Sequence, residues 1–108
     1  MGLFIYDDAR RAEFEDRALA HLQVVILNKL RRRESFVFSW EETRGFVSVW
    51  LHPGVAMQFV YLSNRAPTMN RAWLELLAES ANSTVGLLSL PEPPDVDRGS
   101  DVGPVRAL

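Results

Sequence analysis

The chain has 108 residues, of which 47% are hydrophobic and 10% aromatic, and its formal net charge is -2. This length accommodates one domain. The absence of cysteine excludes a disulfide framework, a thiolate metal site and a cysteine nucleophile. No apolar run is long enough to span a membrane, and the acidic N-terminal segment does not have the pattern of a secretion signal. We therefore expect a cytoplasmic protein.

The N-terminal segment predicts a β-hairpin. A short apolar run at residues 3–6 is followed, after the turn Asp7-Asp8-Ala9-Arg10, by residues 12–15. Two short runs separated by turn residues are typical of antiparallel pairing. We expect these two strands to open the fold.

A long helix is predicted next, from Asp16 to about Arg33. Asp16 is a residue type that favours the N-cap position. The apolar positions with three-and-four spacing are Leu19, Leu22, Ile26 and Leu30. This periodicity places His21 on the polar side of the helix. Val24 falls on that polar side as well, which indicates that part of it is covered.

Three strands follow, at residues 36–40, 46–51 and 57–62. Pro53-Gly54 between the last two predicts a type II turn. Side chains alternate along a strand, so each strand has aromatic residues on one side and aliphatic residues on the other. The sequence thus predicts a sheet that is apolar on both faces. It leaves open which face packs under the helices.

The rest of the chain predicts a second helix, a last strand and a tail. Thr68 is the expected N-cap of a helix that ends near Ala81, and Asn82 suits a left-handed C-cap. A short strand is expected at 85–90. The segment 91–108 is rich in proline and acidic residues and predicts a flexible tail. The prediction is a single α+β domain over residues 1–90, mainly antiparallel, in the order β-β-α-β-β-β-α-β.

Two places along the chain are candidate contacts for an anion or a nucleic acid: the end of the first helix and the start of the second. The residues are Lys29, Arg31, Arg32, Arg33, Asn70 and Arg71. Arginine forks suit phosphate oxygens, and the first helical turn has free backbone amides. Alternatively, cations at a helix C-terminus only complement the helix dipole, by about 0.3–1 kcal/mol each.

Rare residue types also indicate a candidate functional surface, which comprises Trp40, Trp50, His52 and Trp73. The alternative is that such rings simply fill the core, since each buries about 150–250 Å². His52 has no second histidine near it in the sequence, so we expect no metal site. No sequence motif of a hydrolase nucleophile or of a phosphate-binding loop occurs, and no catalytic residue or cofactor is assigned.

Several separated blocks resemble a known family. They are residues 17–26, 34–36, 38–40, 50–53, 70–73 and 81–83. The chain resembles, over residues 1–92, small actinobacterial proteins of unknown function that are common in Microbacteriaceae and often labelled ATP-dependent DNA ligase. Asp7-Asp8 departs from the glycines usual at that turn. The label implies at most an accessory role beside DNA ends, because Lys29, the only lysine, does not begin the K-x-D-G sequence that adenylation needs.

Three functions remain open from the sequence. The first is a non-enzymatic binding or assembly module, in which a second copy or another protein covers an apolar sheet face or the Val24 side of the first helix. The second is a nucleic-acid-binding accessory protein linked to DNA ligation or repair. The third is a small enzyme that uses His52 with a carboxylate. None of the three involves a membrane.

Overall fold

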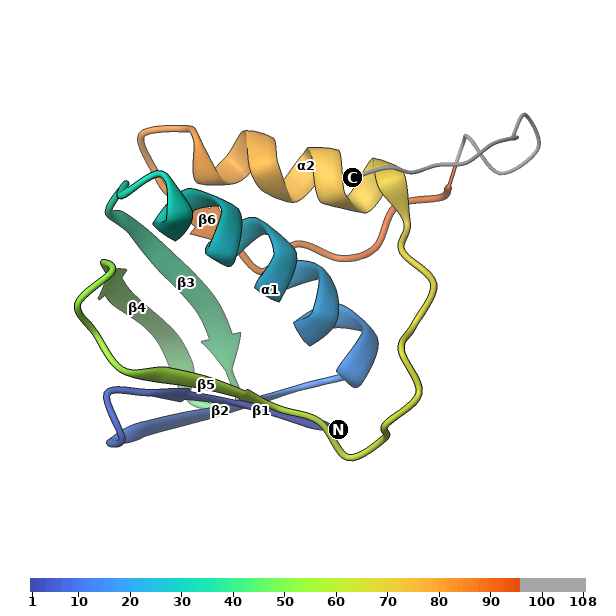
Figure 1. Ribbon diagram of the computed structural model, residues 1–108, viewed down its shortest axis with the longest axis horizontal. Coiled ribbons are helices and arrows are strands. Elements are labelled where there is room, and N and C mark those ends of the chain that lie inside the picture. Colours follow the sequence, from blue (N-terminus) through green and yellow to red (C-terminus); the bar gives the residue numbers. More distant parts are fainter. Residues whose placement is uncertain (96–108) are drawn as a thin grey trace.

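In the computed structural model, which describes residues 1–95, the chain forms an α+β fold with two helices and two three-stranded sheets (Figure 1). The elements, in chain order, are β1 (Gly2–Tyr6), β2 (Arg10–Phe14), α1 (Asp16–Arg31), β3 (Phe36–Glu42), β4 (Gly45–Leu51), β5 (Met57–Val60), α2 (Arg71–Ala81) and β6 (Leu87–Leu88). This order confirms the one that the sequence predicts. Residues 96–108 of the predicted tail lie outside the described part of the chain.

The strands pair as β2-β1-β5 in one sheet and as β4-β3-β6 in the other. All pairs are antiparallel except β3 with β6, which is parallel. The mainly antiparallel pairing agrees with the sequence prediction, but the division into two sheets is not predicted. The reason is that β5 pairs with the N-terminal strand β1 and not with its chain neighbour β4.

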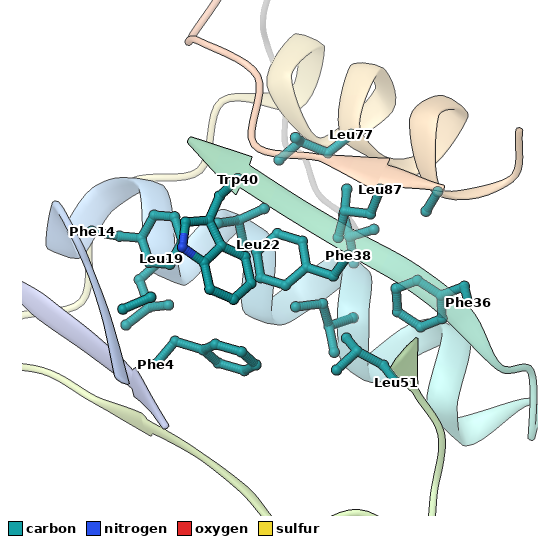
Figure 2. Close-up of a cluster of buried hydrophobic side chains, with 14 of the residues drawn as sticks. Phe4, Phe14, Leu19, Leu22, Phe36, Phe38, Trp40, Leu51, Leu77 and Leu87 are labelled. Carbon is teal, nitrogen blue, oxygen red and sulfur yellow. The ribbon is translucent and has the colours of Figure 1, made fainter. Parts of the chain in front are cut away.

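The core lies between the two sheets and the helices. The rings of Phe36, Phe38 and Trp40 all point inward from β3 and are buried. The ring of Phe4, from the other sheet, lies 5.6 Å from that of Phe38 and 6.1 Å from that of Trp40, measured between centroids (Figure 2). Edge-to-face contacts of this kind stabilise an aromatic core beyond the burial of apolar area.

The expectation of a sheet that is apolar on both faces is wrong. In the β3–β4 pair, Phe38 lies opposite Val49, so aromatic residues of β3 and aliphatic residues of β4 share the inner face. The outer face carries Phe46 and Trp50 of β4, together with a serine pair, Ser39 and Ser48, whose Oγ atoms are 2.7 Å apart. The core therefore has one apolar face of each sheet, and two aromatic rings are left outside it.

The two helices lie side by side and run in the same direction (Figure 1). Near their N-termini His21 of α1 contacts the start of α2 at Asn70, and near their C-termini Lys29 contacts Asn82. His21 is fully buried, so its predicted place on the polar side of α1 is wrong. The helical periodicity of α1 could not indicate that α2 packs over this position.

Several local expectations also change. The residue before α1 is Glu15, whose side chain makes no capping bond, and the N-cap of α2 is Asn70 and not Thr68. Asn82 is right-handed, with φ -89°, and not left-handed. Gly54 does not have the positive φ of a type II turn; the turn closes by a bond from Val55 N to His52 O.

Asp7 and Asp8 join β1 to β2 with positive φ angles of 55° and 57°. Two successive left-handed residues are the requirement of a type I′ hairpin turn, which glycine, asparagine and aspartate tolerate best. The two aspartates at this turn therefore meet its backbone requirement.

The end of α1 has the hydrogen bonds of a Schellman motif around a left-handed Arg33, whose φ is 61°. Arg33 N donates to Leu30 O at 2.9 Å and Glu34 N to Lys29 O at 3.1 Å. Because glycine adopts this conformation without strain, we expect Arg33→Gly to raise the free energy of unfolding by about 0.5–1 kcal/mol. Urea unfolding followed by tryptophan fluorescence measures the change.

Arg32→Gly is the matched control, since φ is -88° at the adjacent position. That substitution gains nothing from left-handed geometry, removes a side chain paired with Glu34, and should lower stability. Equal effects of the two substitutions would contradict this account of the helix end.

Candidate functional site

His21 is the centre of a buried polar network between the helices. Its Nδ1 lies 2.7 Å from the carbonyl oxygen of Arg17, and its Nε2 accepts a hydrogen bond from Asn70 N at 2.8 Å. A carbonyl can only accept and an amide N–H can only donate, so the ring is neutral with its proton on Nδ1. Burial lowers the pKa of His21, in agreement with this state. The imidazole also packs 4.5 Å from the ring of Trp73.

Asn70 extends this network to the C-terminal segment. Its Oδ1 caps α2 by accepting from Trp73 N at 3.1 Å, and its Nδ2 donates to Glu92 Oε2 at 2.8 Å and Pro93 O at 2.9 Å. The side chain of this candidate anion contact is therefore bonded to groups of its own chain. Glu92 and Pro93 belong to the predicted tail 91–108, and here they are held against both helices.

Arg17 completes the network by binding one carboxylate through two hydrogen bonds. Its Nε and one terminal nitrogen donate to the two oxygens of Glu92 at 2.9 and 2.8 Å, and its other terminal nitrogen donates to Thr68 O at 2.6 Å. The hydrogen bonds from Arg17, and then from Asn70, lower the pKa of Glu92 to about 2. Through these bonds, Arg17 connects α1 to the linker before α2 and to the segment after β6.

This network makes stability depend on pH in two steps. The folded-state pKa of His21 lies below its ordinary 6.5, so its contribution is full above pH 6.5 and decreases as the pH falls from there to the folded pKa. The pKa of Glu92 is about 2 instead of 4.5, so its contribution is present above pH 4.5 and is lost as the pH falls toward 2. We expect the urea midpoint to decrease in both windows.

Glu92→Gln separates the two steps. The variant has no carboxylate at this position, so the decrease below pH 4.5 should be smaller while the decrease that begins near pH 6.5 persists. Urea midpoints measured from pH 8 to pH 2, at intervals of about one unit, test this expectation. A midpoint that stays constant between pH 7 and pH 5 would contradict the neutral, buried state of His21.

The basic end of α1 is partly neutralised by one carboxylate. Lys29 is buried, and its Nζ lies 3.0 Å from Glu34 Oε1 and 2.9 Å from Asn82 Oδ1. Arg32 Nε lies 3.3 Å from the other oxygen of the same Glu34, and the hydrogen bond from Lys29 is the main cause of the lowered pKa of this glutamate. Arg31 has only a long bond of 3.4 Å to Asn28 among the contacts of the described residues.

The two groups of candidate anion contacts do not form one site. Lys29, Arg31, Arg32 and Arg33 lie at the C-terminal end of the helix pair, whereas Asn70 and Arg71 lie at its N-terminal end. Arg71 pairs with Glu75 through its Nε, at 3.3 Å. The two places that the sequence indicates are therefore also separate in the structure.

The four candidate aromatic and histidine residues do not share a surface either. Trp40 and Trp73 are buried, and their indole N–H groups donate to Glu42 and Leu90 O at 2.9 and 3.0 Å. His52 lies at the end of β4, where its Nδ1 accepts from Gly54 N at 3.2 Å. Within residues 1–95 no three histidine, aspartate or glutamate side chains are arranged to hold a metal ion.

Trp50 is the one candidate aromatic ring that faces solvent. It is 55% exposed, and Phe46, on the same side of β4, is 62% exposed. Strand β4 is the last strand of its sheet, and the hydroxyl of Tyr6 donates to Trp50 O at 2.5 Å. The outer surface of β3 and β4 around Phe46, Ser48 and Trp50, which we call the outer aromatic face, is a candidate for contact with another molecule.

A groove along α1 is the second candidate. It has a volume of about 580 Å³ and lies between one side of the helix and the segment 61–69. Val24, which the sequence places among polar neighbours, lines it. An apolar residue among polar neighbours is the only sign of this groove in the sequence. The other wall cannot be predicted, because the path of the segment 61–69 depends on contacts distant in the chain.

Comparisons with known proteins place the chain in one family. In the described residues, neither helix has the length and apolar character needed to cross a membrane. Comparison with curated proteins and with solved structures finds no significant match. Residues 1–92 match a family described as a domain of unknown function, DUF7882, and the chain belongs to this family.

Proposed function

We propose that this protein is a non-enzymatic assembly module that pairs with a second copy of itself through the outer aromatic face. The observation that carries the proposal is the exposure of Trp50 and Phe46, at 55% and 62%, on one side of an edge strand. The aromatic rings of the neighbouring strand β3, in contrast, are buried in the core. Tryptophan is the residue type most enriched among the side chains that dominate binding energy at protein interfaces.

The sequence of β4 suits a symmetric contact. Phe46, Ser48 and Trp50 alternate along the strand and point to the same side. A two-fold axis that lies in the interface above Ser48, perpendicular to the direction of β4, would bring Phe46 of each copy opposite Trp50 of the other. Dimers with two-fold symmetry need such a self-complementary patch. The Tyr6 hydroxyl on Trp50 O favours contact between faces over pairing of strand edges.

The size of the patch sets the expected affinity. The exposed parts of the two rings amount to roughly 200–250 Å² per copy, given 150–250 Å² for a whole aromatic side chain. A standard interface buries about 800 Å² per partner. Neighbouring side chains must supply the remainder, so we expect a weak, reversible dimer that forms at high protein concentration.

Light scattering across a range of protein concentrations tests this proposal. The apparent mass should rise from the 12.3 kDa of one chain toward twice that value. Trp50→Ala should keep the mass at one chain at every concentration, with an unchanged circular dichroism spectrum. Leu62→Ala is the control, because Leu62 is 79% exposed and lies beyond the end of β5. A constant mass for the wild type, or equal masses for wild type and Trp50→Ala, would overturn the proposal.

The alternative function is an accessory role near DNA, which the family resemblance suggests. It would rest on Arg31, Arg32 and Arg33, of which Arg32 is paired with Glu34. Because that pairing reduces the charge available to phosphates, we favour self-association. Salt-dependent retardation of DNA by the wild type that is lost in Arg31→Ala, with no dimer at any concentration, would support the accessory role and overturn ours.

A further inference from the structure

We propose that the groove along α1 is a binding site for a small amphiphilic carboxylate, a medium-chain fatty acid or a molecule of that shape, whose carboxylate contacts Arg31. This site is on a different surface from the outer aromatic face and does not depend on self-association. Three features carry the proposal: the dimensions of the groove, the apolar character of its middle and the distribution of charge at its ends.

The groove has two walls from distant parts of the chain. One wall is a single side of α1, and the other is the segment 61–69 that connects β5 to α2 (Figure 1). Its volume of about 580 Å³ is within the usual range for small-molecule sites. Along α1 it extends from Asp16 to Arg31, which at 1.5 Å per residue is about 22 Å. This length suits an extended chain better than a compact ring.

The middle of the groove is apolar. Ala20, Val24 and Leu27 have the four- and three-residue spacing of one helix face. Pro67 and Met69 lie on the opposite wall. These groups offer a hydrocarbon chain a surface from which water can be displaced.

Two polar side chains of the lining are already bonded to each other. Tyr61 donates to Gln23 Oε1 at 2.5 Å, and burial raises the pKa of Tyr61 to about 12, so the phenol stays protonated at neutral pH. The bond ties the segment 61–69 to α1 and leaves the aromatic ring as part of the lining. A ligand therefore needs no polar group at the centre of its length.

Charge at the two ends gives the ligand an orientation. Asp16 lies at one end, where its Oδ2 accepts from Ser63 N at 3.3 Å and its Oδ1 lies 3.8 Å from the N-terminal amine of Met1. Arg65, on the opposite wall, is a second cation of the lining. Arg31 lies at the other end and has no carboxylate partner within residues 1–95. A guanidinium fork matches the geometry of a carboxylate and can hold both of its oxygens. The carboxylate would therefore lie at Arg31, with the hydrocarbon chain directed toward Ala20.

Titration calorimetry with dodecanoate, below its micelle concentration, tests the site directly. We expect saturable binding of one dodecanoate per chain. Dodecylamine, which has the same hydrocarbon chain and the opposite charge, should bind at least tenfold more weakly. Equal affinities for dodecanoate and dodecylamine, or no saturable binding of dodecanoate, would overturn the proposal.

Two adjacent arginines provide a matched pair of variants. Arg31→Gln should weaken dodecanoate binding by about tenfold, since a hydrogen bond to a charged group is lost. Arg32→Gln makes the same change in charge one residue away, outside the groove, and should alter the affinity less than twofold. Equal weakening by both variants would show an effect of net charge and overturn the site.

Val24→Trp should fill the groove and abolish binding without changing the light-scattering mass. If this variant is less stable, the comparison of Arg31→Gln with Arg32→Gln still decides the question, because both positions are exposed. Failure of self-association alone would leave dodecanoate binding intact, so the two proposals fail separately. Full affinity in a folded Val24→Trp protein would exclude the groove as the site.

Discussion

Replacing Gly86 with alanine should lower the free energy of unfolding by about 3 kcal/mol or more. Gly86 has φ 86°, where an L-residue is strained by about 1–2 kcal/mol. An added Cβ would clash with the carbonyl oxygen of Val37 and lie 3.0 and 3.1 Å from Cβ and the carbonyl carbon of Val37. Overpacking of this kind costs about a further 1–3 kcal/mol.

The clash cannot be relieved by rotating a side chain, because the nearest atom belongs to the backbone of β3. The alternative is that β6 moves away, which would disturb the fully buried Leu87 and its pairing with Phe38. For a domain of this size we expect a melting temperature about 15 °C lower. Differential scanning calorimetry gives both the temperature and the enthalpy.

Two other glycines separate the causes of this effect. Gly45 has φ 138° but open space around a built Cβ, so Gly45→Ala should show the conformational strain alone, about 1 kcal/mol. Gly54 does not have a positive φ, and its built Cβ meets only the imidazole of His52, at 3.3 Å, so Gly54→Ala should be nearly neutral. The loss of stability should be largest for Gly86→Ala, smaller for Gly45→Ala and smallest for Gly54→Ala. Any other order would contradict the packing described for β6.

Asn70→Ala should be the second most damaging substitution, at about 3 kcal/mol. It removes the N-cap of α2, which is worth about 0.5–2 kcal/mol. It also removes the hydrogen bonds from Asn70 Nδ2 to the carboxylate of Glu92 and to Pro93 O, and the net contribution of such a bond is about 0.5–1.5 kcal/mol. Urea unfolding at pH 7 measures the loss.

Thr68→Ala is the natural control for Asn70→Ala, because the sequence predicts Thr68 as the helix cap. Thr68 is exposed, and only its backbone oxygen takes part in the network, by accepting from Arg17. The substitution should change stability by less than about 0.5 kcal/mol. A Thr68→Ala effect as large as that of Asn70→Ala would mean that α2 begins earlier than the structure indicates.

Local patterns were sufficient to predict the elements of this fold. Alternation of apolar residues located β3 and β4, and three-and-four spacing located α1, because these periods follow from backbone geometry. Errors were confined to the ends: α2 begins at Arg71, and the last strand is reduced to Leu87–Leu88. A strand end depends on its partner, and here the left-handed Gly86 restricts how early β6 can begin.

Long-range pairing was beyond the sequence patterns. The same alternation would suit β5 next to β4 or next to β1, and only the tertiary structure selects β1. In the β3–β4 pair Trp40 lies opposite Val47 and Trp50 opposite Val37, so Trp40 is inside and Trp50 outside, although both are tryptophans on adjacent strands. The prediction of one candidate surface from the rare residues could not separate them.

For the candidate sites, too, local patterns predict the residues and long-range contacts decide their environment. The basic end of α1 was evident as a cluster of cations, but the pairing of Lys29 with Glu34 and Asn82 requires the loop after α1 and the end of α2. Helical periodicity predicts His21 on the polar side because it treats each helix alone. Its burial follows from α2, which supplies the backbone amide of Asn70 to its ring.

A concentration series of amide NMR spectra is the most direct test that the outer aromatic face joins two copies. With increasing protein concentration we expect shifts of the Phe46, Ser48 and Trp50 amides and of the Trp50 indole, while resonances of α1 and of α2 stay constant. Spectra that are identical at all concentrations, or shifts confined to the helices, would contradict the account.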